Sequence, residues 1–419
     1  MDKRAVFTII TFLVLILAST AAIAYNKGYR PNFDNKLPAV EENGLLAATS
    51  NPNGAQVFVN DHLITATDDT LTLPDGEYHV KIVKDGYIPW EKQLKVKKGV
   101  VTETQARLFP AASDLRAETS TGALLPTLSP DGTKLVYGVA SGSAAKQGVW
   151  VMDLTERPLL AQAQSRQVAE DLAGTTFTWS PDSKQIIAST ERVGFLLEAD
   201  RLNTLSQNIT PTINLILESW NKDTKTREND RLGNLKPKLS EELKNIQIIA
   251  WSPDETKILY TATQSATLGP ILETPPPGSS TQAEERNIKS GRIYVYDVKE
   301  DKNFFLSEKI PLLQKDQEDE KRQENQEEKT NPLDIIKKIG QSQRVQPIRW
   351  FPDSRHLIWV GETDISIVEY DGTNKNVIYS GPFENSFVYP WPNGSKILIL
   401  TTYNRPAGVL PNLYSISLQ

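Results

Sequence analysis

The chain of 419 residues is too long for one ordinary domain, and it carries 46 Lys and Arg against 52 Asp and Glu, for a net charge of −6. No segment is purely basic, so we expect no nucleic-acid partner. The absence of cysteine removes disulfides, thiolate nucleophiles, cysteine-ligated zinc, iron–sulfur clusters and a lipid-modified N-terminal cysteine. The three histidines, His62, His79 and His356, are far apart in the sequence, so carboxylate chemistry is the main catalytic possibility left.

The N-terminal segment 1–27 predicts a membrane anchor. Residues 5–24 form an uncharged apolar run after Lys3 and Arg4, and twenty helical residues at ~1.5 Å each span the hydrocarbon core of a bilayer. The alternative is a signal peptide cleaved after Ala24, although the run exceeds the ~7–15 apolar residues usual for such peptides. We therefore predict a single-pass membrane protein with its N-terminus inside and most of the chain outside the cytoplasm; the alternative is a secreted protein.

Residues 28–43 predict a linker, because they contain two prolines, several asparagines and little apolar periodicity. In the following segment, 44–110, short strands are separated by turn residues, and apolar side chains alternate in 77–83 and 93–97. This pattern predicts a small antiparallel β-sandwich or meander with one buried face.

The turns of this small β-domain resemble those of a PEGA domain. Its landmarks occur in the family's order, although Asn53 replaces an acidic residue of the first motif. The resemblance rests on Pro52, Gly54, Ala55, Gly76, Tyr78, Gly86 and Tyr87. It implies a surface-associated module that contacts carbohydrate or protein and has no activity of its own.

Turn geometry explains the same residues without a binding site. We expect Gly54, Gly76 and Gly86 to supply positive φ where the chain reverses. Tyr87 and Trp90 either cap the core, which we favour, or form an aromatic binding spot.

Residues 111–419 contain five copies of one hairpin. The conserved positions of the five turns within this chain are Pro130, Asp131 and Gly132; Pro181 and Asp182; Pro253 and Asp254; Pro352 and Asp353; and Pro392, Asn393 and Gly394. A tryptophan precedes four of these turns, at Trp179, Trp251, Trp350 and Trp391. One small sheet cannot bury both of its faces, so the repeats predict radially packed blades, a β-propeller, with the tryptophans between blades.

The hairpin motif resembles the blades of the TolB-like, WD40-like family. We therefore expect an all-β fold class: an N-terminal transmembrane helix, a PEGA-like β-sandwich, and a β-propeller of five recognisable blades with partly helical or disordered insertions.

The four turn aspartates could be imagined as a carboxylate ring that binds calcium or acts as an acid. We favour a local role, because Asp in a turn bonds the backbone N–H groups near it, and Asn393 fills the fifth position. We accordingly predict no catalytic, cofactor-binding or metal-binding residue.

The hairpins are more widely spaced after the second and third copies, which predicts insertions near 202–245, 263–290 and 300–344. Within them, 237–244 is typical of a short helix capped by Ser240, 314–330 is charged and lacks apolar residues, and 331–339 is typical of an amphipathic helix. They are either solvated segments or an extension of one rim that contacts a partner.

The fifth copy ends at Gln419 only one strand after its hairpin, so it lacks an outer strand. We predict that residues 115–119, arriving from the PEGA-like segment, complete this blade and close the ring.

The favoured function is a non-catalytic, membrane-anchored envelope protein whose propeller presents a rim to protein or glycan. The first alternative is an enzyme or enzyme-associated propeller. A peptidase would need a G-x-S-x-G elbow and an α/β domain, which we do not find, and a glycosidase would need two carboxylates ~5–9.5 Å apart. The second alternative is a TolB-like component of an envelope transport complex, although the PEGA-like segment stands where that family has an α/β domain.

Overall fold

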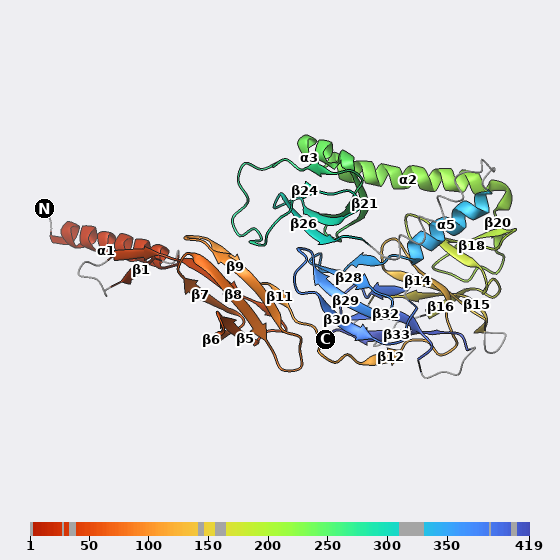
Figure 1. Cartoon of the computed structure of the whole chain (residues 1–419), viewed down its shortest axis with the longest axis horizontal. Coiled ribbons are helices and arrows are strands. Elements are labelled where there is room, and N and C mark those ends of the chain that lie inside the picture. The colour runs from red at the N-terminus through yellow and green to blue at the C-terminus, as the bar shows by residue number, and fades with distance from the viewer. Residues whose placement is uncertain are drawn as a thin grey trace. The chain divides into compact units, whose positions relative to one another are not determined.

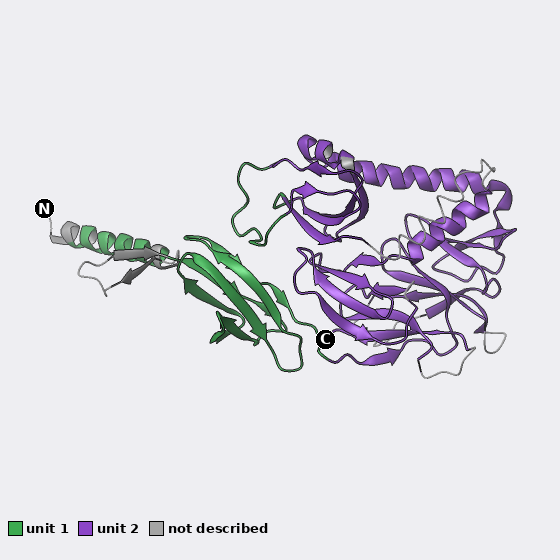
Figure 2. Cartoon of the chain, viewed as in Figure 1, with its two compact units in different colours: residues 1–111, 272–284, 299–301 green, residues 112–271, 285–298, 302–419 purple. Residues whose placement is uncertain are grey.

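The computed structural model describes residues 3–26, 29–32, 39–140, 146–155, 165–309, 331–384, 387–403 and 409–419 (Figure 1). The charged segment 314–330 lies outside these ranges. The chain divides into two compact units (Figure 2). Unit 1 contains residues 1–111, 272–284 and 299–301, and unit 2 contains residues 112–271, 285–298 and 302–419.

Unit 1 begins with helix α1 (Lys3–Asn26), whose apolar side chains from Phe7 to Leu17 are exposed wherever they are described. A search of the described residues for a helix long and apolar enough to cross a membrane finds none. The segment 28–43, predicted as a linker, contains an antiparallel pair, β1 (Tyr29–Asn32) and β2 (Ala39–Glu42). A two-stranded ribbon has two free edges, so it tolerates Pro31 opposite Val40.

The rest of unit 1 is built around two facing sheets. One has the order β10-β3-β7 and the other β6-β5-β8-β9, while β4 and β11 form a separate pair. The strands are β3 (Gly44–Ala48), β4 (Ser50–Asn51), β5 (Gln56–Val59), β6 (His62–Ala66), β7 (Asp69–Leu73), β8 (Gly76–Val83), β9 (Trp90–Val96), β10 (Val101–Glu103) and β11 (Ala106–Arg107). Alternate residues of β9 are buried, as the sequence pattern predicts.

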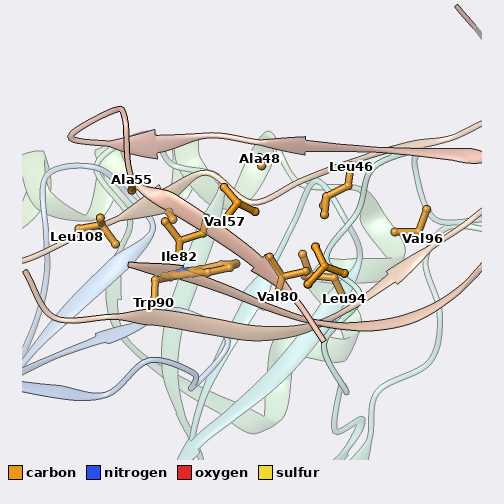
Figure 3. Close-up of a cluster of buried hydrophobic side chains, with 12 residues drawn as sticks. Leu46, Ala48, Ala55, Val57, Val80, Ile82, Trp90, Leu94, Val96 and Leu108 are labelled. Carbon is orange, nitrogen blue, oxygen red and sulfur yellow. The ribbon is translucent and has the colours of Figure 1, made fainter. Parts of the chain in front are cut away.

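The side chains between the two sheets form one core, from Leu46 and Val57 to Trp90 and Leu108 (Figure 3). The expectation of purely antiparallel pairing is wrong, because β10 and β11 pair in parallel with β3 and β4. After β9 the chain crosses from one sheet to the other. There β10 runs beside β3 in the same direction, as strands joined by a crossover do.

The described part of unit 2 contains five four-stranded antiparallel sheets, which are the five blades of the predicted propeller. Blade 1 contains β13 (Leu124–Leu128), β14 (Lys134–Val139), β15 (Gly148–Asp153) and β16 (Ser165–Ala169); blade 2 contains β17 (Thr176–Trp179), β18 (Gln185–Ser189), β19 (Gly194–Glu198) and β20 (Gln207–Asn208); blade 3 contains β21 (Ile246–Trp251), β22 (Lys257–Ala262), β25 (Ile293–Asp297) and β26 (Lys302–Ser307); blade 4 contains β27 (Ile348–Trp350), β28 (His356–Val360), β29 (Asp364–Glu369) and β30 (Asn376–Ser380); blade 5 contains β31 (Val388–Pro390), β32 (Lys396–Thr401), β33 (Asn412–Ser417) and β12 (Leu115–Ala117).

The fifth blade is completed by the first strand of the unit, as predicted. Strand β12 pairs antiparallel with β33, with Leu115 opposite Ile416 and Ala117 opposite Tyr414. Just beyond the strand, Glu118 accepts hydrogen bonds from Lys396 (2.9 Å) and from Ser415 (2.7 Å). The fifth blade is therefore completed by hydrogen bonds between segments at opposite ends of the unit.

Among the described residues, apolar clusters join three pairs of neighbouring blades. Blade 5 packs on blade 1 through residues such as Trp391 and Tyr137, and blade 1 packs on blade 2 through residues such as Val151 and Trp179. Blades 3 and 4 share a further cluster. The first strands of neighbouring blades contact one another, β13 with β17 and β21 with β27, so these strands line the axis.

The facing sides of blades 2 and 3 are covered by insertions. Ile187 of blade 2 packs with residues of α2 (Ile213–Gly233) and α5 (Pro332–Arg344). Tyr260 of blade 3 packs with Leu239 of α3 (Pro237–Glu242) and with residues near β23 (Ala266–Thr267) and β24 (Asn287–Ile288). Figure 1 shows α2 running from β20 towards α3. In a regular propeller, blades 2 and 3 would pack directly on each other. Here helices α2, α3 and α5 pack on them instead.

The predicted insertions need two corrections. The ranges 202–245 and 300–344 include β20 and β26, which are the fourth strands of blades 2 and 3. The predicted cap at Ser240 is also wrong, because α3 begins at Pro237 and its N-cap residue is Lys236. Proline suits the first position of a helix, since its missing N–H has no intrahelical partner there.

Candidate functional site: turns, blade contacts and the seat of helix α5

The turn aspartates bond within their own turns. Asp131 Oδ1 accepts hydrogen bonds from Ser129 Oγ (2.6 Å) and from the N–H of Thr133 (3.0 Å). Asp182 and Asp254 make corresponding bonds to Ser180 and Ser252, both at 2.7 Å. Burial raises the pKa of these three carboxyls, but the hydrogen bonds outweigh it and leave each pKa below its usual range.

The fourth and fifth turns use the same principle with other residues. Asp353 Oδ1 accepts from the N–H groups of Arg355 (2.9 Å) and His356 (3.0 Å), and Asp353 Oδ2 lies 2.8 Å from Nδ1 of buried His356. Asn393 accepts from the N–H of Ser395 (2.9 Å). Among the residues that the structure describes, no group of three acidic or histidine side chains could hold a metal ion.

The residue after each turn acid or amide has a left-handed backbone. Gly132 and Gly394 fill this position in blades 1 and 5, whereas Ser183, Glu255 and Ser354 fill it in blades 2, 3 and 4, all with φ between 57° and 71°. The serines have a reason to be there. Ser183 Oγ accepts the N–H of Asp131 (3.2 Å) and Ser354 Oγ that of Asp254 (3.0 Å), each across a blade boundary.

The predicted inter-blade tryptophans take different positions. Trp179 donates from Nε1 to Thr127 O of blade 1 (2.9 Å), and Trp350 donates to Ala250 O of blade 3 (3.4 Å). Trp391 is buried in the cluster shared by blades 5 and 1, under the ammonium of Lys396. Trp251 differs, because it packs in the cluster of blade 3 and the insertions. Trp251 therefore meets insertion residues where a neighbouring blade was expected.

The PEGA-like landmarks are turn and core residues in the structure. Gly54 and Gly86 have φ of 69° and 82°. The prediction of a positive φ at Gly76 is wrong, because this residue begins strand β8 in extended backbone. Tyr78 donates its hydroxyl to Pro74 O (3.1 Å) and lies against Gly76.

Two further landmarks, Ala55 and Tyr87, lie at the core. Ala55 is buried, and Pro52 follows Asn51 through a cis peptide bond. Trp90 is buried and the partly buried Tyr87 packs against the same cluster. Both aromatics therefore contribute to the core.

Helix α5 lies along β17, the innermost strand of blade 2, and this contact was not anticipated from the sequence. The Gln343 side chain accepts the N–H of Trp179 (3.0 Å) and donates to Trp179 O (3.2 Å), as the backbone of an adjacent strand would. Thr178 Oγ1 donates to Ile336 O (2.8 Å). A Cβ at Gly340 would stand 2.5 Å from Phe177 O, so only glycine allows the helix to approach this closely.

The C-terminal end of α5 is held by blades 4 and 5. The guanidinium of Arg349 donates to Arg344 O (3.0 Å) and Gln343 O (3.3 Å). The Tyr389 hydroxyl oxygen lies 2.7 and 2.9 Å from the same two carbonyl oxygens, between which its single proton is shared. Arg349 also lies over the ring of Tyr389, 3.8 Å from its centroid. Burial raises the pKa of Tyr389, against the lowering effect of the arginines, so the hydroxyl stays a donor.

These groups suit the end of a helix. The last carbonyls of a helix lack intrahelical donors and carry the negative end of its dipole, so a cation and a hydroxyl both stabilise them. We call the groups that hold this helix the α5 seat: Thr178, Trp179, Arg349 and Tyr389, with the apolar Ile187, Ile209, Ile213 and Leu217. The only sequence signals were the amphipathic pattern of 331–339 and the Asn-Pro start, and Asn331 does cap the helix by accepting the N–H of Leu333 (3.2 Å).

Comparison with known proteins finds one family model. Residues 43–111 match the PEGA domain. A search of curated proteins finds no match. Among solved structures, the chain is similar to one assigned as TolB from Agrobacterium tumefaciens, at 13% identity and a TM-score of 0.20 over 70% of this chain and 73% of that one. It is also similar to TolB from Acinetobacter baumannii, at 12% identity and a TM-score of 0.21 over 82% of this chain and 60% of that one.

Proposed function

We propose that this protein is a membrane-anchored, extracytoplasmic binding or scaffold protein of the cell envelope, which uses one end of its propeller to contact a protein or glycan and catalyses no reaction. The observation that carries the proposal is where the insertions emerge. Strands alternate in direction within each blade, so the β20–β21, β22–β25 and β26–β27 connections all leave the end opposite the hairpin turns. Loops at one end of a rigid scaffold are the usual place for recognition.

The hairpin end offers less for recognition. Its turn aspartates are used by their own turns, and two of its serines are used by the neighbouring blade. A group that already has its partners contributes little to an external ligand. A partner that binds at the insertion end leaves these structural bonds intact.

The membrane part of the proposal rests on α1 and the sequence. The helix has 24 residues, and the uncharged run 5–24 lies within it. Large apolar side chains on it are exposed, Phe7 at 74% and Leu17 at 67%. Exposed apolar area of this kind is stabilised by transfer from water to hydrocarbon.

A photo-crosslinking experiment in intact membranes tests the binding end. A photoreactive residue replaces Lys225 on exposed α2, and a matched variant carries it at Lys184 in the hairpin turn of blade 2. We expect a discrete cross-linked protein or glycan from Lys225 and none from Lys184. Equal cross-linking from both positions, or from Lys184 alone, would contradict the proposal.

A further inference from the structure

Four aromatic side chains gather at the insertion end, where the chain passes from blade 4 to blade 5. Tyr379 lies on β30, Phe383 on the β30–β31 connection, Tyr403 on the β32–β33 connection and Tyr414 on β33. Both connections leave the end opposite the hairpin turns, because strands alternate in direction within a blade. We call these four residues the aromatic cluster.

The four rings form two pairs. The rings of Tyr379 and Phe383 meet edge to face with their centroids 6.1 Å apart, and those of Tyr403 and Tyr414 do so at 6.4 Å. An edge-to-face pair covers one ring face, whereas a parallel stack covers two. The cluster therefore offers two corners, each formed by the face of one ring and the edge of another.

Hydrogen bonds hold the two pairs beside each other. The carbonyl oxygen of Pro382 accepts from the hydroxyls of Tyr379 (3.3 Å) and Thr401 (2.6 Å). The Thr401 hydroxyl oxygen in turn accepts the N–H of Tyr403 (3.1 Å). Because the protein itself fixes the rings, a ligand does not have to order them on binding.

The exposure of the cluster distinguishes it from the aromatic residues of the core. Tyr403 is 43% exposed and the other three are partly exposed, whereas Phe387, Tyr389 and Trp391 of blade 5 are at most 2% exposed. Single exposed apolar residues are common on protein surfaces, but a cluster of them indicates a contact site.

The chemistry of the cluster indicates the class of ligand. A tyrosine has an apolar face and a hydroxyl at its edge, and a sugar ring has a similar arrangement, with a face of C–H groups and hydroxyls around it. Burial and the neighbouring Tyr403 raise the pKa of Tyr379, so its hydroxyl stays protonated and can both donate and accept. Among the described residues of the two connections, Glu384 carries the only charge, so no cation there favours an anionic ligand.

We propose that the aromatic cluster binds a neutral oligosaccharide, with a sugar ring packed in each corner and sugar hydroxyls bonded to the tyrosine hydroxyls. The inference rests on the proposed function and names its ligand class, a glycan, and the place where it binds. Sugar binding is measured on the purified protein. It can therefore fail while cross-linking from Lys225 still identifies a protein partner at the same end.

Fluorescence anisotropy with the full chain in lipid nanodiscs tests the proposal. The probes are oligosaccharides released by mild acid from the envelope of the native host, labelled at their reducing ends and separated by anion exchange into a neutral and an acidic pool. The variants Phe383→Ala and Tyr403→Ala each remove one ring, from different pairs. The matched control is Val377→Ala, at an exposed apolar position of β30 outside the cluster.

We expect the neutral pool to bind the wild type and Val377→Ala equally, and to bind each ring-removing variant about tenfold more weakly. Tyr403→Phe keeps the ring and loses one hydroxyl, so it should bind about threefold more weakly. Absence of binding by the neutral pool, preference for the acidic pool, or undiminished binding by both ring-removing variants would overturn the proposal.

Photo-capture in intact membranes covers the case in which an alanine variant fails to fold. A photoreactive residue replaces Tyr403, which lies on an exposed connection, and we expect the captured material to contain sugar. Capture of a protein that carries no sugar would assign the cluster to a protein partner and overturn the proposal.

Discussion

At the residue scale, the turn acids show how one position serves five blades. Asp131, Asp182 and Asp254 bond a Ser hydroxyl and a backbone N–H of their own turn, and Asn393 makes the backbone bond without a charge. The local role could be predicted from the sequence, because an Asp after a proline in a tight turn has backbone N–H groups within reach. The bonds from Ser183 and Ser354 to the previous blade could not be, since they depend on how the blades meet.

Replacement of Asp254 separates the turn bond from the charge. We expect Asp254→Ala to lower the free energy of unfolding by about 1 kcal/mol, because Ser252 and Thr256 lose their acceptor. Asp254→Asn should lose less, as Asn393 shows that an amide fits this turn. Urea denaturation at pH 7 measures both, and equal losses for the two variants would count against the turn bond as the cause.

The same aspartate predicts a pH dependence. Its folded pKa is lowered by its hydrogen bonds, so its contribution to stability is present above the unfolded value of about 3.9 and is lost as pH falls through the folded pKa. The wild type should therefore lose more stability than Asp254→Asn between about pH 5 and pH 2. Parallel melting curves of the two proteins over that range would contradict this assignment.

Two tryptophans offer a matched measurement of an inter-blade hydrogen bond. Trp179 donates to Thr127 O, whereas Nε1 of buried Trp391 has no hydrogen-bond partner among the described residues. The two Trp→Phe changes remove the same side-chain volume. Trp179→Phe should lower the free energy of unfolding by about 1 kcal/mol more than Trp391→Phe, because only Trp179→Phe leaves a buried carbonyl without its donor. Chemical denaturation decides, and a larger loss for Trp391→Phe would refute the argument.

At the scale of elements, ring closure follows from counting strands. The fifth hairpin copy lacked an outer strand in the sequence, and β12 supplies it by pairing with β33. Helix α2 was not predicted, because only its first turns have apolar side chains at helical spacing, and those from Lys222 to Arg231 are polar and exposed. Its pattern depends on covering Ile187 of blade 2, which the sequence does not reveal.

Closure predicts a large stability effect. Replacing residues 111–121 by a Gly-Ser segment of equal length should lower the melting temperature sharply, because the β12–β33 ladder and the bonds of Glu118 are lost together. The control is a Gly-Ser replacement of the five residues Gly278–Gln282, outside the blades. A melting temperature that is unchanged on replacement of 111–121, measured by calorimetry, would refute closure by β12.

At the scale of the whole molecule, the proposed anchor predicts an orientation. If the N-terminus is inside, protease added to intact spheroplasts should digest the propeller. A propeller that the protease leaves intact would indicate the reverse orientation. Deletion of residues 1–26 should release the chain from the membrane fraction. N-terminal sequencing of the mature protein distinguishes the anchor from cleavage after Ala24, and a new N-terminus at Tyr25 would replace the anchor by a secreted form.

The sequence by itself determined the repeat number, the turn chemistry, the β-sandwich and the strand that closes the ring, because each follows from local spacing and from the need of a small sheet to bury its faces. Only the tertiary structure decided where the ring is interrupted and what fills the interruption. Blade 2 meets α2 and α5, and Gln343 reaches Trp179 from 164 residues away in the sequence. Such contacts join segments whose local sequence patterns are independent of each other, so they cannot be predicted from the periodicity of either segment.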